Sequence, residues 1–238
     1  MTNTTAFDLN NVAYDRDGNI TALQRQRSGN ESYTYGYVAG SGRLSAVTGT
    51  GAAAGTFAYD RNGAITSITG GAYAQSSLYG RNGLPYQITS GGQTNRYLYD
   101  GTGQRVYQSA GDGRYIVRGA FGEELAEYTV AGKLNAHMLG GYGRAENTGV
   151  KVGYVTDYLG SVRVAVESGG TVRQVVDYYP FGLQMPGRTY VSGTPTREGF
   201  TGHELDAETS LNYMGARYYM PALGRFTSVD GYAEGYPS

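Results

Sequence analysis

The 238-residue sequence contains no cysteine and no tryptophan, and it has no long uninterrupted run of apolar residues. Without cysteine there is no disulfide framework and no thiolate to act as a nucleophile. No stretch approaches the roughly 18–20 apolar residues of a membrane-spanning helix. Residues 1–10 also lack the basic and apolar segments of a secretory signal peptide. We therefore expect no membrane span, and either a chain cut from a longer polypeptide or export without such a signal.

An excess of charge of one sign is also missing. The 19 basic and 20 acidic residues give a net charge of −1. Proteins that bind nucleic acid or anionic lipid through bulk charge carry a clear basic bias. We therefore expect no nucleic-acid partner.

Glycine and tyrosine are abundant, with 39 Gly and 24 Tyr against only 6 Phe and 6 Pro. Tyrosine favours pleated, half-buried surfaces, because its ring is apolar and its hydroxyl seeks a partner. Glycine at this frequency indicates many tight turns that need positive φ. The composition therefore predicts an all-β protein with short strands.

A repeat of about twenty residues is the strongest internal signal. Its pattern is Tyr-Asp-x-x-Gly-x-φ, where φ is apolar, and three of its tyrosines are spaced by twenty residues. The residues that define the copies are Tyr14, Asp15, Gly18, Tyr59, Asp60, Gly63, Tyr79, Gly83, Tyr99, Asp100 and Gly103.

Each copy predicts a β-hairpin. Residues such as 56–59 alternate with period two, which puts alternate side chains on one face of a strand. The Asp after each strand can accept turn amides, and the Gly supplies positive φ. Successive hairpins would stack Tyr on Tyr across neighbouring strands. The repeat therefore predicts antiparallel hairpins in one spiral or meandering sheet, the wall of a shell or tube.

Beyond residue 110 the repeat loosens. Residues 121–128 favour a strand with a turn at Gly122, although Glu-Glu-Leu-Ala-Glu also suits a helix. Residues 154–178 predict a hairpin that turns at 168–170, and residues 190–195 predict a loop.

The last third carries ordered motifs: Thr156-Asp-Tyr-Leu-Gly-Ser-Val-Arg163, Tyr178-Tyr-Pro-Phe-Gly182, Phe200-Thr-Gly-His-Glu204, Leu211–Tyr219 and Gly224–Asp230. Their order resembles the RHS-repeat-associated core, and the Tyr-Asp copies resemble the YD repeats that precede it. The resemblance implies YD-repeat hairpins over residues 1–110. It also implies a core-like region over 111–238 that continues the same sheet. In this family the sheet spirals into a hollow shell, which encloses a toxic segment in secreted toxins and serves at the cell surface in other members.

Toxin-encapsulating members also resemble an aspartyl autoprotease, with one Asp after the Ala-Arg-Tyr-Tyr block and a second after Gly-Arg-Phe. Here Met220 occupies the first position, and Asp230 matches the second. Two carboxylates are needed to divide the roles of acid and base. We therefore expect no enzyme activity, with residual self-cleavage through Asp230 as the alternative. The core motif comprises Arg217, Tyr218, Tyr219, Gly224, Arg225, Phe226 and Asp230, and we expect its two arginines to stack on tyrosine or to pair with Asp230.

Other chemistry finds little support. The segment from Asp15 resembles the start of a calcium loop, but Gln26 stands where a bidentate Glu is required. His203 and Glu204 could suggest a metal site, but the only other histidine is His137. We expect no metal and no cofactor. The tyrosines could form platforms for sugars, but cross-strand packing is the more economical explanation.

A structural role follows, in one of two forms. Lysine and proline on an edge strand hinder the addition of another strand. The sequence has only two lysines, Lys133 and Lys151, and only one proline before residue 180, Pro85, so its sheet edges have little such protection. The first interpretation is a subunit that self-associates, edge to edge, into a shell, tube or filament. The second is the C-terminal part of a larger toxin shell with a toxin cargo. Either would be secreted or lie at the cell surface.

Overall fold

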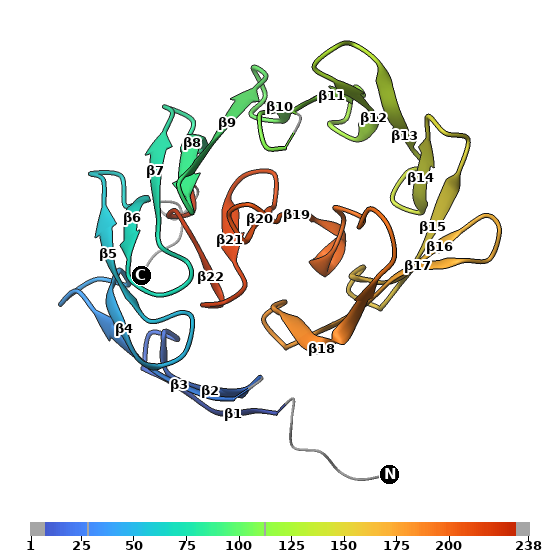
Figure 1. Cartoon of the computed structure of the whole chain (residues 1–238). Coiled ribbons are helices and arrows are strands. Elements are labelled where there is room, and N and C mark those ends of the chain that lie inside the picture. Colours follow the sequence, from blue (N-terminus) through green and yellow to red (C-terminus); the bar gives the residue numbers. More distant parts are fainter. Residues whose placement is uncertain (1–7, 28, 112, 232–238) are drawn as a thin grey trace, which may run out of the picture.

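The computed structural model describes residues 8–27, 29–111 and 113–231, and it is built almost entirely of β-strands (Figure 1). Eighteen strands form one antiparallel sheet, here called the wall. The wall strands are β1 (Leu9–Tyr14), β2 (Ile20–Gln26), β3 (Asn30–Tyr37), β4 (Leu44–Thr50), β5 (Gly55–Tyr59), β6 (Ile65–Thr69), β7 (Gln75–Tyr79), β8 (Pro85–Ser90), β9 (Gln93–Tyr99), β10 (Arg105–Gln108), β11 (Arg114–Arg118), β12 (Glu124–Thr129), β13 (Leu134–Met138), β14 (Gly143–Glu146), β15 (Lys151–Thr156), β16 (Val162–Glu167), β17 (Val172–Tyr178) and β18 (Gln184–Val191).

Each wall strand pairs with the strands before and after it in sequence, so the wall is a long meander. It curves into a ring in which β18 returns close to β1 and β2 (Figure 1). Side chains bridge this seam: the Tyr179 hydroxyl donates to the Gln26 carbonyl, and the Arg25 guanidinium lies 5.6 Å from the Tyr179 ring centroid.

The repeated turns explain the Tyr-Asp-x-x-Gly pattern. Asp60 Oδ1 accepts the amides of Asn62 and Ala64, both at 2.9 Å, and Gly63 has φ +81°. The same bonds recur from Asp15, Asp100 and Asp157. Tyr59, Tyr79 and Tyr99 each end a strand, at equivalent places in consecutive hairpins. A short Asp side chain and a glycine in the left-handed region thus fix each turn.

The tyrosines connect the hairpins mainly by their hydroxyl groups. Tyr37 donates to the Ile20 carbonyl at 2.6 Å, and Tyr99 donates to the Pro85 carbonyl at 2.8 Å. In both cases the bond runs from the end of one strand to the start of its neighbour. Tyr107 and Tyr115 pack across neighbouring strands, with ring centroids 5.0 Å apart and ring planes tilted by 42°. At Tyr37 and Tyr99, hydroxyl-to-carbonyl bonds therefore take the place of the predicted stacking of Tyr on Tyr.

A second sheet, here called the inner sheet, lies inside the ring (Figure 1). It comprises β19 (Glu204–Asp206), β20 (Leu211–Tyr213), β21 (Tyr218–Met220) and β22 (Arg225–Phe226), and a short 3-10 turn, η1 (Phe200–Gly202), precedes it. Strands β11–β18 continue the wall, but residues 204–226 do not, so the expected continuity of 111–238 with one sheet is wrong for this segment. The boundary at residue 110 stays a prediction.

The core lies between the inner sheet and the wall strands β2–β9. Wall residues such as Leu23, Ile88 and Tyr97 pack there against Leu211 and Tyr218, all with at most 1% of their surface exposed. Residues 121–128 form a turn followed by β12, so the helical alternative is wrong. Strand β18 extends through Val191, beyond the start of the expected loop. No helix in the described part of the chain is long and apolar enough to cross a membrane.

Candidate functional site: the seat of the inner sheet

Arg105 joins the wall to the inner sheet. It begins β10, and none of its side chain is exposed. Its Nη2 donates to Glu204 and its Nη1 to Asp206, both at 2.6 Å, while Nη1 also lies 2.9 Å from the Tyr218 hydroxyl. The guanidinium stacks 4.4 Å from the Tyr213 ring centroid. A charge buried in this way requires partners with good geometry, and the inner sheet supplies both of the carboxylates.

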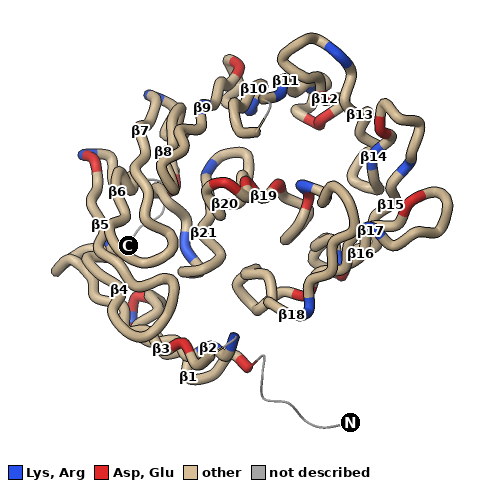
Figure 2. The backbone as a smooth tube through the Cα atoms, in the orientation of Figure 1, with Lys and Arg blue, Asp and Glu red and all other residues tan. Residues whose placement is uncertain are grey.

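The network extends beyond Arg105 along the inner face of the wall. Arg114 on β11 pairs with both Glu204 and Glu127, and Glu127 then pairs with Arg144 at 3.1 Å. Figure 2 shows charged residues of both signs along this part of the ring. The continuous series of ion pairs is Arg105, Glu204, Arg114, Glu127, Arg144, Glu146, Arg173 and Glu167. The ion pairs therefore follow the wall from β10 to β17, whereas the main apolar cluster lies against β2–β9.

The carboxylates of this network differ in their electrostatics. Burial favours a raised pKa for Glu204, but Arg105, Arg114 and Arg197 outweigh burial and lower its pKa to about 2. Asp206 shares Arg105 with Glu204, and burial raises the pKa of Asp206. Burial also raises the pKa of Glu124 to about 7, aided by the negative charges of Glu204 and Glu127. Glu124 is thus a carboxyl group of the cluster whose negative charge is poorly compensated at neutral pH.

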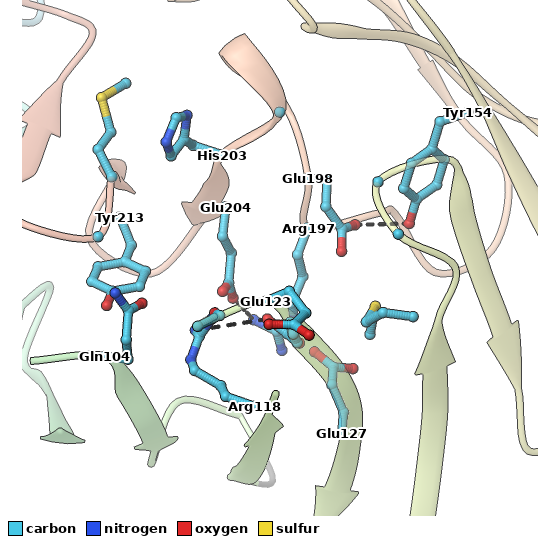
Figure 3. Close-up of a pocket in the computed structure, with 18 of the residues that line it drawn as sticks. Gln104, Arg118, Glu123, Glu127, Tyr154, Arg197, Glu198, His203, Glu204 and Tyr213 are labelled. Atoms are coloured by element: carbon cyan, nitrogen blue, oxygen red, sulfur yellow. Dashed lines mark hydrogen bonds and ion pairs between the residues drawn. The ribbon is translucent and has the colours of Figure 1, made fainter. Parts of the chain in front are cut away.

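A cavity of about 340 Å³ opens beside this network (Figure 3). Carboxylates from the wall and from the segment before the inner sheet line it, with Arg118 and Arg197 among them. The Tyr154 hydroxyl donates to Glu198 at 2.8 Å. Across the described ranges, no three His, Asp or Glu side chains are arranged to hold a metal ion.

Most of the core motif lies around another cavity, which is lined by Arg217, Gly224, Arg225, Phe226 and Asp230. Arg217 pairs with Asp230 at 2.8 Å, and its guanidinium lies 3.8 Å from the Phe226 ring centroid. Arg225 donates to the Tyr37 hydroxyl at 3.1 Å and to the Gly42 carbonyl at 2.6 Å.

The remaining residues of the motif hold the inner sheet against the wall. Tyr218 is fully buried, and Tyr219 donates to the Phe181 carbonyl at 3.0 Å. Gly224 has φ +68°, and a Cβ there would lie 3.1 Å from the Phe181 ring. Met220 is 2% exposed and belongs to the apolar core. The site that the sequence singled out is therefore one of packing, and Met220 is buried in it.

Sequence reasoning missed Arg105, Glu204 and Asp206 as a unit, although one signal was available. The seventh position of the repeat is apolar in other copies, as at Ile20 and Ile65, whereas the copy that begins at Tyr99 has Arg105 there. A charge at a position that faces the core requires a buried partner. The partner could not be identified, because Asp206 is 101 residues away in sequence.

Comparison with known proteins finds a similar fold in solved toxin structures. No protein-family model matches the chain. Salivary gland surface protein 1 of Aedes aegypti is 38% identical over 76 residues, which are 31% of this chain and 2% of that protein.

Two solved structures are similar over most of the chain. The Photorhabdus luminescens Tc holotoxin pore matches with a TM-score of 0.69 and 20% identity, over 93% of this chain and 12% of that chain. The crystal structure of TcdB2-TccC3 matches with a TM-score of 0.69 and 18% identity, over 92% and 12%. The chain thus has the fold of a segment of these toxin structures and spans about an eighth of their length. The likeness supports an RHS-type fold.

Proposed function

We propose that the chain is a structural, non-enzymatic part of an RHS-type shell, in which the wall is braced from within by the inner sheet. The observation that carries this proposal is the burial of Arg105 between them, with its ion pairs to Glu204 and Asp206. A wall without the inner sheet would leave this guanidinium without its two carboxylate partners, and Arg114 without Glu204. The proposal places the chain in a larger secreted or cell-surface protein with a toxin cargo.

The edge strands favour a shell segment over a filament. Strand β1 has register shifts between Asn10 and Tyr14, and Asn11 has φ +50°. Strand β18 has a register shift opposite Val176–Tyr178 and contains Pro186 and Gly187. Bulges and proline at an edge hinder the addition of another strand. The features that hinder further strand pairing thus lie in β1 and β18, the first and last strands of the wall.

Sedimentation velocity of the purified chain over a hundredfold concentration range tests this choice. We expect a compact monomer throughout, with no filaments under the electron microscope. Concentration-dependent growth into filaments would instead support the second candidate, a subunit that assembles through its edges.

A non-catalytic role is supported by the surroundings of Met220 and Asp230, the two residues at the positions of the family's aspartyl pair. Met220 is buried in the apolar core, and Asp230 pairs with Arg217 while 47% of its side chain is exposed. An aspartyl pair divides the roles of acid and base between two carboxylates, and Met220 supplies no second carboxylate. Intact-mass spectrometry over several days should therefore record one constant mass. A cleavage product that disappears in Asp230→Asn would establish the self-cleaving alternative.

A further inference from the structure

The turns along one rim of the wall are of two kinds. In a meander, alternate turns lie on the same rim, so the turns that close the hairpins β5–β6, β7–β8, β11–β12, β13–β14 and β15–β16 share one rim. The two earlier turns present exposed polar residues at their centres, namely Arg61 and Asn62, then Arg81 and Asn82. The three later turns present small or apolar residues instead: Ala120, Phe121, Gly140, Gly141, Tyr142, Tyr158 and Leu159. The structural role proposed above makes no use of this difference.

Three aromatic side chains of the later turns are almost fully exposed. Phe121 is 96% exposed, Tyr158 is 94% exposed and Tyr142 is 82% exposed. Tyr59 and Tyr99, which end strands at the same rim, are half-buried. Single exposed apolar residues are common on protein surfaces, but here they recur at three consecutive turns of one rim. Rings this exposed contribute little to the stability of the fold, so they are available for an interaction.

Hydrogen bonds within the turns fix the direction of these three residues. The Phe121 amide donates to the Glu123 carboxylate at 3.0 Å, and the Leu159 amide donates to Asp157 Oδ1 at 3.0 Å. The Tyr142 amide donates to the carbonyl three residues earlier at 3.1 Å and closes its own turn. Consecutive turns of the rim are two strands apart along the wall, which corresponds to about 10 Å. The three aromatic residues therefore form a row of separate projections along the rim, here called the aromatic row.

The chemistry of the aromatic row favours a lipid surface over a folded protein as its partner. A protein partner needs a contiguous area of complementary shape, whereas a fluid surface closes around each projection separately. Aromatic side chains are enriched at the level of the lipid headgroups. Turns 119–122, 139–143 and 157–160 contain no Lys or Arg that could attract anionic lipid. The carboxylates beside the row, Glu123 and Asp157, accept turn amides. The row therefore suits zwitterionic headgroups.

We propose that the rim from β11 to β16 docks on a zwitterionic lipid surface, with Phe121, Tyr142 and Tyr158 inserted among the headgroups. The contact is peripheral, because only the turns enter the headgroup layer and the strands stay outside it. The turns that contain Arg61 and Arg81 have no such rings, so the ring of strands meets the surface at a tilt. The proposal does not depend on whether the chain is a shell segment, because it rests on the exposed turns alone.

Tryptophan fluorescence of the full chain tests the proposal, because the chain has no tryptophan of its own. Phe121→Trp places the only indole in the aromatic row. Asn62→Trp places it at the equivalent position of a polar turn on the same rim, and it is the matched control. On addition of phosphatidylcholine vesicles, we expect a blue shift of the Phe121→Trp emission and its quenching by brominated phosphatidylcholine. Neither change is expected for Asn62→Trp.

Vesicle flotation of the native chain and its variants measures the strength of docking. Combining Phe121→Ser with Tyr158→Ser should lower the partition coefficient about a hundredfold, roughly tenfold for each ring. Tyr14 is an exposed tyrosine in the polar part of the same rim, and Tyr14→Ser should leave the partition coefficient nearly unchanged. Vesicles of an equimolar mixture of phosphatidylcholine and phosphatidylserine should bind the chain no more strongly than phosphatidylcholine alone.

Four results would overturn the proposal. They are absence of binding to phosphatidylcholine, equal blue shifts of Phe121→Trp and Asn62→Trp, binding that requires phosphatidylserine, and self-association of the chain that the double Ser variant abolishes. The third result would assign binding to charge elsewhere on the molecule, and the fourth would assign the aromatic row to a second copy of the chain.

Discussion

At the scale of single residues, this protein depends on charges placed where an all-β sheet would ordinarily bury apolar side chains. Arg105 replaces the apolar residue of its repeat and is compensated by Glu204 and Asp206. Removing one member of a buried ion pair is more costly than never having had the pair, because the other charge remains buried.

Arg105→Met is therefore expected to lower the free energy of unfolding by about 3–5 kcal/mol, measured by urea denaturation. Arg96→Met, on the exposed face of β9, is the control and should change it by less than about 0.5 kcal/mol. Adding Asp206→Asn to Arg105→Met should recover part of the loss, since it removes one unpaired carboxylate. Equal stability of the two single variants would refute the bracing role of Arg105.

Glu124 should make stability fall as the pH rises. Its folded-state pKa is about 7, against an ordinary value of 4.5, so the folded protein holds the proton more tightly than the unfolded chain does. The resulting penalty is absent below pH 4.5, grows between 4.5 and 7, and is complete above 7. Glu124→Gln should therefore raise the unfolding free energy at pH 8, by at most about 3 kcal/mol, and have little effect at pH 4.

Thermal unfolding of Glu124→Gln and of the exposed-site control Glu208→Gln, at pH 4, 6 and 8, measures this difference. If Glu124→Gln changed the stability equally at all three pH values, the effect would come from packing and not from the charge of Glu124.

The residues that determine local structure could be predicted from the sequence, whereas the long-range pairs could not. Asp60 and Gly63 act within one turn, so their roles follow from spacing alone. Glu204 and Asp206 pair with Arg105, about a hundred residues earlier in the sequence, and no local sequence pattern indicates such a contact. The buried Met220 was noticed as a departure from a motif, but its place in the core became clear only from the structure.

At the scale of elements, the hairpin turns look alike but do not have equal surroundings. Gly63 and Gly83 occupy the same turn position, with φ +81° and +74°. A Cβ on Gly83 would meet nothing within 4 Å, whereas one on Gly63 would lie 2.7 Å from Val229. Val229 therefore packs against the turn that contains Gly63, whereas no residue packs in this way against the turn that contains Gly83.

Gly83→Ala should cost about 1–2 kcal/mol, the strain of a left-handed alanine. Gly63→Ala should cost clearly more, because Val229 must also move. Hydrogen exchange should show faster exchange around Thr227 in Gly63→Ala but not in Gly83→Ala, since Thr227 accepts the amide of Ile65 at 2.8 Å. If both variants lost the same stability and showed the same exchange rates around Thr227, Val229 would not be packed against the Gly63 turn.

The strands differ in how far sequence could predict them. The wall strands are five to eight residues long in the clear repeats, and their turn signals mark both ends. The inner strands have only two or three residues, too few for a periodic pattern to emerge. The expectation that residues 111–238 continue one sheet came from the family resemblance, and no local pattern in residues 204–226 pointed to a separate inner sheet.

At the scale of the whole molecule, the order in which contacts can form follows from the meander. Every wall strand bonds to its nearest neighbours in sequence, so each hairpin can form as soon as it is synthesised. Arg105 is different, because its partners emerge from the ribosome about a hundred residues later. Until then its charge must remain hydrated, and the ring interior must remain open to water. We therefore expect biogenesis in two stages: the wall hairpins form first, and the interior beside Arg105 is closed when the inner strands pack against it.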